Sequence, residues 1–247
     1  MGSKIALVTG AGKRLGAAIA KALASDGYKV WVHFNRSADE AGQIVADIRA
    51  NGGEAEAVQF DLSNTDALPP LVRKLGRIDA LVNSASIFDY DSADRLDPAA
   101  MQHILNINLV APCLLASVMA ENHVEKNSGC VINLLDQKLF NLNPDHFSYT
   151  LAKAALHAAT ETMAMQFAPR VRVNGIAPGL TLPAPEMDAA AFATAHAENP
   201  MQGGSTPEDI VRTVRFILAS PAMTGETIVV DGGEHLMRRH RDVSKGG

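Results

Sequence analysis

The sequence predicts an α/β fold, a doubly wound parallel sheet of about seven strands with helices on both faces. Short apolar runs alternate with longer segments of helical spacing along the chain, which is the order typical of a parallel sheet. A glycine-rich turn also follows the first apolar run and opens the first helical segment, as in folds that bind phosphate at a helix N-terminus. No linker or repeat divides the chain, so we expect a single domain over residues 1–247.

The strands are predicted from short apolar runs, rich in β-branched residues, that end at turn-forming residues. In chain order, the expected strands are residues 5–9, 29–34, 55–59, 80–82, 130–134, 172–174 and 227–230. The segments between them show helical spacing of apolar residues. The expected helices are residues 15–24, 39–51, 65–75, 98–121, 149–167 and 207–219. Short polar side chains accept hydrogen bonds from free N–H groups at a helix start, and the expected N-caps are Asp39, Thr65, Asp97 and Thr206.

Two long stretches interrupt the alternation. Residues 83–95 are rich in Asp and Ser, and residues 180–204 carry three prolines and an Ala/Met-rich middle. Both follow strands, so both should lie at the carboxyl edge of the sheet, where doubly wound sheets bind ligands. The apolar content of residues 180–204 favours a substrate lid loop over a disordered segment.

Composition excludes several classes of protein. Hydrophobic residues make up 47% of the chain and the net charge is −5, which argues against disorder and against a nucleic-acid surface. The two cysteines and eight histidines show no ligand spacing, so no metal site or disulfide framework is expected. With no leader and no long uncharged apolar run, we expect a cytoplasmic protein without a membrane span. The basic end, residues 238–247, is expected to be a frayed tail.

The turn after the first strand reads Thr-Gly-x-x-x-Arg-x-Gly. Its glycines, Gly10, Gly12 and Gly16, let the backbone approach a ligand and let the following helix pack closely. The N-terminus of that helix offers free N–H groups and a positive dipole to a phosphate. The pattern resembles the short-chain dehydrogenase/reductase family, whose common form carries a glycine where Arg14 stands, so this turn must tolerate a side chain there. The resemblance implies a Rossmann-type fold, with Lys13 and Arg14 adding positive charge near the cofactor phosphates.

The residues at the end of the second strand indicate whether the chain binds NAD(H) or NADP(H). An NAD-selective site places an acid here to bind the ribose 2′-hydroxyl, but this chain has Asn35, Arg36 and Ser37. Arg36 can pair with a 2′-phosphate and Ser37 can donate to it, which favours NADP(H) over a merely solvated arginine. By resemblance, further cofactor contacts fall to residues after the third, fourth and sixth strands. They are Asp61, Leu62, Asn83, Ser84, Ala85, Ser86, Pro178 and Gly179.

A proton-delivery pair lies on one helix. Tyr149 and Lys153 are four residues apart and therefore share a helix face. A nearby ammonium is expected to lower the pKa of the tyrosine from its ordinary value near 10, so that the pair can act as general acid or base. By resemblance, Asn108 helps to hold a water and the lysine. The alternative for Asn108 is a helix-interior residue satisfied locally.

One position departs from the ordinary family pattern. Where most members have a serine that binds the substrate carbonyl, this chain has Asp136. The combination resembles the pteridine reductase branch of the family, which shares an aspartate here. Its other counterparts in this chain are Lys13-Arg14-Leu15-Gly16, Asn35-Arg36-Ser37, Phe88 and Pro178-Gly179-Leu180, while Asn35 and Ser84 depart from the residues usual in that branch.

The resemblance implies a role for each of these residues. Asp136 and Tyr149 would supply protons to the ring nitrogens of a pterin, and Phe88 would stack on its ring, with Ser86 and Leu180 also contacting the substrate. The alternatives are that Asp136 caps local N–H groups and that Phe88 is a core or lid aromatic.

Three functions are compatible with these residues: a dihydropterin reductase, a reductase of a ketone, sugar or quinone with Asp136 incidental, and a cofactor-sensing protein without turnover. The intact Tyr149 and Lys153 count against the third. The family resemblance also implies a homotetramer with residues 98–121 and 149–167 as its main interface helices.

Overall fold

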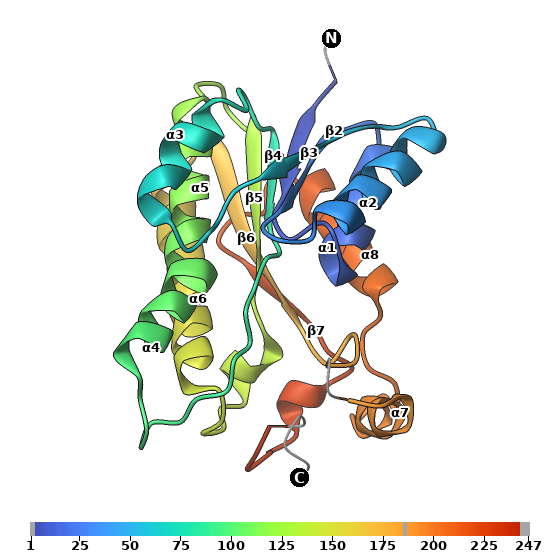
Figure 1. The fold of residues 1–247 in the computed structure, drawn as a ribbon, viewed down its shortest axis with the longest axis vertical. Helices are drawn as coiled ribbons and strands as arrows, with labels where there is room; N and C mark the ends of the chain where they lie inside the picture. The colour runs from blue at the N-terminus through green and yellow to red at the C-terminus, as the bar shows by residue number, and fades with distance from the viewer. Residues whose placement is uncertain (1–2, 185–186, 243–247) are drawn as a thin grey trace.

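The computed structural model describes residues 3–184 and 187–242 (Figure 1). Seven parallel strands form one sheet in the order β3-β2-β1-β4-β5-β6-β7. The chain therefore starts near the middle of the sheet, runs to one edge and then crosses to the other, which confirms the predicted doubly wound fold. The strands are β1 Ile5–Val8, β2 Lys29–Phe34, β3 Glu54–Gln59, β4 Ala80–Asn83, β5 Gly129–Leu134, β6 Val171–Pro178 and β7 Thr227–Val230.

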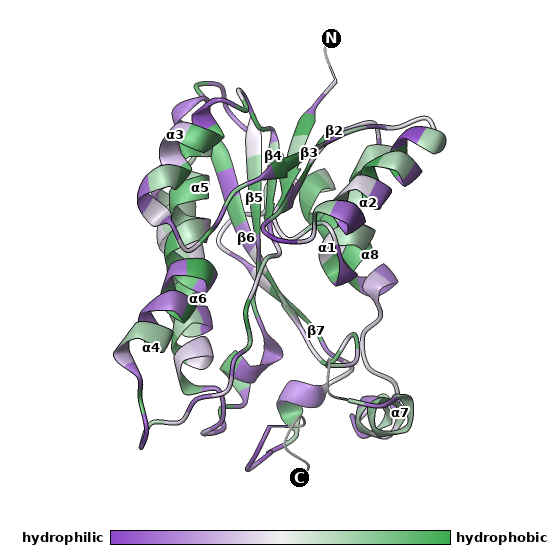
Figure 2. Cartoon of the chain, viewed as in Figure 1, coloured by the Kyte–Doolittle hydropathy of each residue, from purple (hydrophilic) through white to green (hydrophobic). Residues whose placement is uncertain are grey.

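Helices cover both faces of the sheet (Figure 1). One face carries α1 Arg14–Ser25, α2 Ala38–Ala50 and α8 Pro207–Ala219. The other carries α3 Leu68–Arg73, α5 Ala111–Glu121 and α6 Phe147–Phe167, with α4 Pro98–Leu105 beside α6. The inner strands β1, β4 and β5 and much of α5 are mostly hydrophobic (Figure 2), because a strand covered on both faces has no polar side. The two larger apolar clusters of the described residues lie one on each face of the sheet.

The run predicted as one helix over residues 98–121 is continuous but changes its winding. A π-helical stretch, Asn106–Val110, joins α4 to α5. The run Pro98–Glu121 is also long and apolar enough to cross a membrane, with a mean hydropathy of 1.7 over its most apolar window, contrary to the expectation that no such segment exists. More than half of that window, 56%, is buried inside the fold, as in a core helix.

Two of the four expected N-caps are confirmed. Asp97 accepts from the N–H groups of Ala99 and Ala100, and Thr206 forms a reciprocal capping box with Asp209. The other two are wrong. α2 begins at Ala38, so Asp39 lies inside its first turn, and Thr65 lies inside a short 3₁₀ segment, Thr65–Ala67.

Other boundaries differ from the prediction as well. Residues 180–204, expected to form a loop, contain the helix α7 Ala189–Ala197, whose start is capped by the Asp188 side chain. α6 begins two residues before Tyr149, because Asp91 from the loop after β4 accepts from the N–H and hydroxyl of Ser148. A cap supplied from another segment cannot be read from the local pattern.

Candidate active site

The glycine-rich turn joins β1 to α1 and has no room for a side chain at Gly10 or Gly16. Gly10 has a φ of +65°, and a Cβ there would lie 2.9 Å from the Cα of Ala85. A Cβ on Gly16 would lie 2.4 Å from the carbonyl oxygen of Gly10. On the far side of the turn, the hydroxyl of Thr9 accepts from the N–H groups of Ser84 and Ala85, at 3.0 Å each. The turn after β1 and the loop after β4 are therefore held together.

The buried His33 of β2 holds this turn in place through a hydrogen bond to Gly10. Gly10 N donates to Nδ1 of His33 over 3.1 Å, and the other ring nitrogen lies 3.0 Å from the carbonyl oxygen of Phe60. Burial lowers the pKa of His33 to about 4, so the ring is neutral at physiological pH. A neutral ring that accepts at Nδ1 must carry its proton on Nε2, where it donates to Phe60.

The sequence predicts a turn that tolerates a side chain at Arg14, but the backbone there takes a conformation that side chains disfavour. The φ of Arg14 is +54°, so the residue occupies the left-handed region that the family's glycine would adopt without strain. Its guanidinium donates to the carbonyl oxygens of Pro183, over 2.8 Å, and Leu182, over 3.4 Å. Arg14 therefore links the phosphate turn to residues 180–204. Lys13 forms an ion pair with Glu40 at 2.5 Å.

The end of β2 fits a phosphorylated ribose. Arg36 is exposed, and Asp61 beyond β3 lies near enough for the two charges to interact. A Cβ on Gly12 would lie 2.9 Å from the hydroxyl oxygen of Ser37, so this hydroxyl stands against the glycine turn and makes no capping bond to α2. A cation and a hydroxyl beside a closely packed glycine turn suit an NADP(H) molecule with its phosphates on the turn.

The proposed proton donors meet above the end of β5. Tyr149 donates from its hydroxyl to Oδ2 of Asp136 over 2.6 Å. The other carboxylate oxygen, Oδ1, accepts from the backbone N–H of Lys138 over 2.8 Å and so caps the short 3₁₀ helix Gln137–Phe140, called η3. Asp136 thus both caps a local N–H group and contacts Tyr149. Lys153 donates to the carbonyl oxygen of Leu134 over 2.6 Å, with its Nζ 5.6 Å from the centre of the Tyr149 ring.

The pKa of Tyr149 moves opposite to the expectation. Burial raises it well above 10, and the neighbouring Asp136 raises it further. Burial also raises the pKa of Asp136 and lowers that of Lys153 to about 8. The site therefore favours neutral forms, with the phenol protonated and its proton directed at the carboxyl group.

Phe88 lines the same cavity as Tyr149. Its ring stacks on the ring of His146, with centroids 3.7 Å apart, and meets Tyr149 edge-on at 4.6 Å. The side chain is 40% exposed, so Phe88 is not a core residue. Ser86 also hydrogen-bonds Tyr149.

One cavity of about 630 Å³ joins the glycine turn to the proton donors. It collects most of the predicted site, including Gly10, Lys13, Arg14, Leu15, Ser84, Ala85, Ser86, Phe88, Asp136, Tyr149, Lys153, Pro178, Gly179 and Leu180. Asn35, Arg36, Ser37 and Asp61 lie outside it, at the ends of β2 and β3. Leu62 and Asn83 point into the interior instead, where Asn83 donates to Asn133 over 2.8 Å.

Asn108 also lies outside this cavity. It is fully buried in the π-helical stretch, and its side-chain amide exchanges two hydrogen bonds with the backbone of Ile87, at 2.9 and 3.1 Å. Its side chain therefore holds the loop after β4, and its expected part in holding a water and Lys153 stays a prediction.

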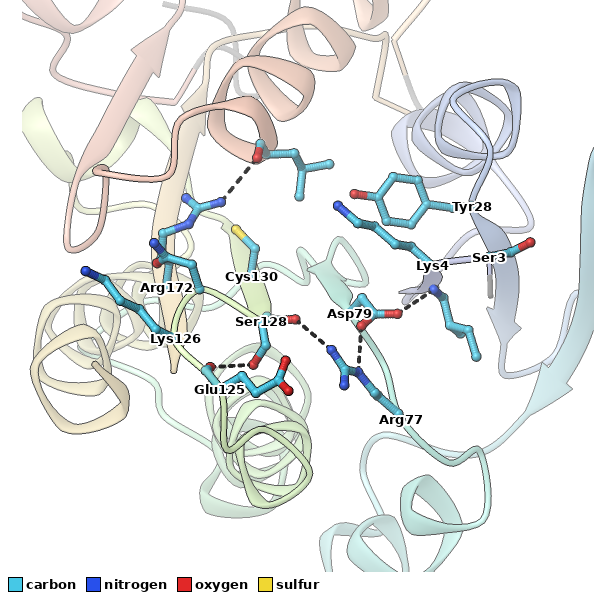
Figure 3. A pocket seen from close by; sticks show the side chains of 14 residues that line it. Ser3, Lys4, Tyr28, Arg77, Asp79, Glu125, Lys126, Ser128, Cys130 and Arg172 are labelled. Atoms are coloured by element: carbon cyan, nitrogen blue, oxygen red, sulfur yellow. Dashed lines mark hydrogen bonds and ion pairs between the residues drawn. The ribbon is translucent and has the colours of Figure 1, made fainter. Parts of the chain in front are cut away.

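A second cavity, of about 460 Å³, lies at the amino ends of the strands, opposite the carboxyl ends that carry the first cavity (Figure 3). Three of the charged groups that line it, Arg77, Asp79 and Arg172, have structural partners. Arg172 donates to the carbonyls at the end of α8, and Asp79 pairs with Arg77 while accepting from the N–H of Ile5. The burial-raised pKa of Cys130, about 11, keeps its thiol protonated and unreactive. The first cavity is therefore the candidate active site.

Sequence reasoning missed the acids that complete the site. Glu234 and Asp242 both line the first cavity. Glu234 accepts from Leu180 N over 3.2 Å, and burial raises its pKa. The tail is not frayed over its described part, because Asp242 is buried and Arg239 reaches Glu198 at 3.0 Å. These residues lie about a hundred positions after Asp136, and only the fold brings them there.

Comparison with known proteins agrees with this geometry. Residues 4–194 match the family model for short chain dehydrogenases. The chain is 36% identical to the 3-oxoacyl-[acyl-carrier-protein] reductase of Synechocystis sp., with 94% of this chain and 96% of that protein covered. It is 32% identical to pteridine reductase 1 of Leishmania tarentolae, with 95% of this chain and 97% of that protein covered.

Solved structures of similar proteins contain the expected cofactor. FolM alternative dihydrofolate reductase 1 from Brucella canis, complexed with NADP, has a TM-score of 0.89 and 39% identity, covering 97% of this chain and 96% of that one. A short chain dehydrogenase from Burkholderia cenocepacia, also in complex with NADP, has a TM-score of 0.84 and 30% identity, covering 93% and 97%.

Proposed function

The chain belongs to the short-chain dehydrogenase family, and we propose that it is an NADPH-dependent reductase of a dihydropterin. The observation that carries the proposal is the hydrogen bond from Tyr149 to Asp136, 2.6 Å long, between two residues that line the cavity. A family serine at this position offers a hydroxyl to a carbonyl oxygen. A carboxylic acid beside a phenol instead forms a proton relay, which suits the reduction of a carbon–nitrogen double bond.

The chemistry divides between cofactor and protein. When bound, the cofactor would supply the hydride that reduces the carbon of the C=N bond, and the ring nitrogen would take up one proton from the protein. Tyr149 and Asp136 hold that proton in a site that favours their neutral forms, and solvent restores it after each turnover. Lys153 stands behind the phenol and keeps the pair oriented through its bond to Leu134.

Binding follows from the shape of the cavity. Phe88 presents a partly exposed aromatic edge beside Tyr149, and residues 180–204 close the opposite wall through Leu180, Thr181 and Leu182. A flat heterocycle fits between them, with Ser86 and Leu180 at its rim. Residues 180–204 then act as the substrate lid, and Arg14 ties this lid to the cofactor turn.

A ketone reductase is the second candidate, because a 3-oxoacyl-[acyl-carrier-protein] reductase is among the relatives. In that case Tyr149 alone would protonate a carbonyl oxygen, and Asp136 would serve only to cap η3. A cofactor-sensing protein without turnover is a weaker candidate, since it has no use for the Tyr149 and Lys153 pair.

The deciding experiment measures NADPH oxidation with dihydrobiopterin or dihydromonapterin, and with a panel of ketones that includes an acetoacetyl thioester. The variant is Asp136→Ser, since serine keeps a side-chain oxygen that can cap η3 but removes the carboxyl group. We expect kcat on the pterin to fall by about 10²–10⁴, the usual contribution of a general acid. The exposed Asp94→Ser is the matched control and should retain full activity.

Two results would contradict the proposal. Turnover with ketones alone would assign the chain to the second candidate. Full pterin activity in Asp136→Ser would show that Tyr149 needs no acid beside it.

A further inference from the structure

The C-terminal residues pack against the segment that links the two proton donors. This segment runs from Asp136 to Tyr149 and includes Lys138, whose side chain is only 3% exposed. The Lys138 ammonium donates to Oδ2 of Asp242 over 3.0 Å and to the backbone carbonyl of Asp145 over 2.7 Å. A buried lysine thus joins the end of the described chain to the active-site loop.

A second set of contacts fastens the same two segments. Arg241 grips the carboxylate of Asp145 through both Nε and Nη2, at 2.6–3.1 Å, and also hydrogen-bonds the side chain of Tyr90. The backbone N–H of Asp242 donates to Asp145 over 2.8 Å. These bonds hold the pKa of Asp145 at about 2, so it stays an anion throughout the physiological range. We call Lys138, Asp145, Arg241 and Asp242 the C-terminal clasp.

The clasp reaches the proton donors directly. Lys138 bonds Asp136 through its backbone N–H and Asp242 through its ammonium, so one residue connects both acids. Asp136 and Asp242 also line the same cavity. A buried ion pair contributes little net stability, because apolar residues of the same size would fill the space as well. Net stability therefore does not explain why the Lys138–Asp242 ion pair lies close to Asp136, but an effect of the two charges on Asp136 would.

We propose that Lys138 and Asp242 are positioning residues for the proton donor Asp136, and that the C-terminal clasp completes the active site of its own chain. The inference rests on the proposed function, in which Asp136 must carry a proton to donate it. Asp242 supplies a fixed negative charge that favours the neutral carboxyl group, while Lys138 limits that effect and holds the loop in place.

The charges around Asp136 determine the direction of each effect. Lys153 of α6 lowers its pKa, and Tyr149 lowers it by donating a hydrogen bond. Asp242 raises it, and Glu234 of the 3₁₀ segment Glu234–Leu236 is a second carboxyl group that interacts with it. The Lys138 ammonium faces Asp242.

The experiment is the pH dependence of kcat/KM for two variants that break the same ion pair from opposite ends. Asp242→Asn leaves the Lys138 ammonium unbalanced and lowers the pKa of Asp136. The alkaline limb, where Asp136 loses its proton, should move to lower pH by about one unit. Lys138→Met removes the cation that faces the Asp242 carboxylate, so the limb should move to higher pH. The double variant should return close to the wild-type profile.

Structural damage gives a different result, because it reduces kcat without shifting the two limbs in opposite directions. Asp47→Asn, which breaks the exposed pair with Lys21, is the control and should leave the profile unchanged. Limbs that stay fixed, or that move in the same direction in both variants, would overturn the proposal.

A substrate-free measurement separates this inference from the proposed function. The carbon-13 resonance of the Asp136 carboxyl group, assigned through Asp136→Asn, reports the same pKa shifts without turnover. Opposite shifts in a protein that fails to reduce pterins would support the clasp and reject the substrate. Pterin reduction without opposite pKa shifts of Asp136 would support the proposed substrate and reject the role of the clasp.

Discussion

Arg36 lies after the end of β2, where its positive charge can favour the binding of NADPH over NADH. The side chain is exposed and β2 ends without the acid that would bind a ribose 2′-hydroxyl, so a 2′-phosphate meets a cation there. We expect Arg36→Ala to weaken NADPH binding by about 10–100-fold, the equivalent of one charge-assisted hydrogen bond, and to leave NADH binding nearly unchanged. Fluorescence titration of both cofactors measures this.

The matched control for Arg36 is Arg212→Ala, an exposed arginine on α8 that pairs with Asp209. It should affect neither cofactor. An equal loss of NADPH and NADH binding in Arg36→Ala would show that Arg36 supports the strand end and does not read the phosphate.

Also at the residue scale, Tyr149 shows how burial can override a neighbouring charge. The spacing to Lys153 led us to expect a lowered tyrosine pKa, yet the pKa is raised. The ammonium is itself buried and its own pKa falls to about 8, which weakens its effect on the phenol. Asp136 then adds a negative charge on the other side. The prediction failed because desolvation depends on the segments that cover the helix, and these are not evident in its spacing.

At the scale of elements, β2 carries His33, which links the stability of the fold to pH. Its pKa falls from 6.5 to about 4 on folding, which corresponds to about 3 kcal/mol at about 1.4 kcal/mol per pH unit. The unfolded chain binds the proton more readily between these two values. The contribution of the neutral ring is therefore complete above pH 6.5 and is lost progressively as the pH falls towards 4.

His33→Gln tests this contribution, because glutamine can accept from Gly10 and donate to Phe60 without titrating. We expect the variant to lose less unfolding free energy between about pH 7.5 and about pH 5 than the wild type, as measured by urea unfolding. The exposed His103→Gln should behave as the wild type. An identical pH dependence in wild type and His33→Gln would contradict the assignment.

At the scale of the whole molecule, the tetramer implied by family resemblance stays a prediction. α6 carries two exposed apolar side chains, Leu151 and Met165, which are 40% and 73% exposed. Such residues on an expected interface helix should be covered by a second copy. We expect the double variant Leu151→Glu/Met165→Glu to yield a smaller species in analytical ultracentrifugation.

Val124→Glu is the control for the tetramer, since Val124 is also apolar and 83% exposed but lies beyond the end of α5. It should keep the wild-type mass. A wild type that sediments as a monomer would contradict the predicted tetramer.

Much of the molecule could be predicted because the information is local. Strand and helix periods, the glycine turn and the Tyr149 and Lys153 spacing each lie within a few residues, and the parallel sheet and the NADP(H) cofactor that they predict are confirmed. Boundaries were predicted less well where a distant group supplies the cap, as Asp91 does for α6. The helix α7 was missed because its proline- and alanine-rich surroundings resemble a loop.

The fold, the family and the set of acids and bases at the sheet edge all follow from the order of the amino acids. Which of these acids and bases meet depends on how the chain packs. Packing turned Asn108 to Ile87, aimed the Tyr149 hydroxyl at Asp136 and brought Asp242 to Lys138, 104 positions away. The physical reason is that hydrogen bonds and desolvation depend on distances in space, and residues far apart in the chain become neighbours only when the sheet and its helices have packed.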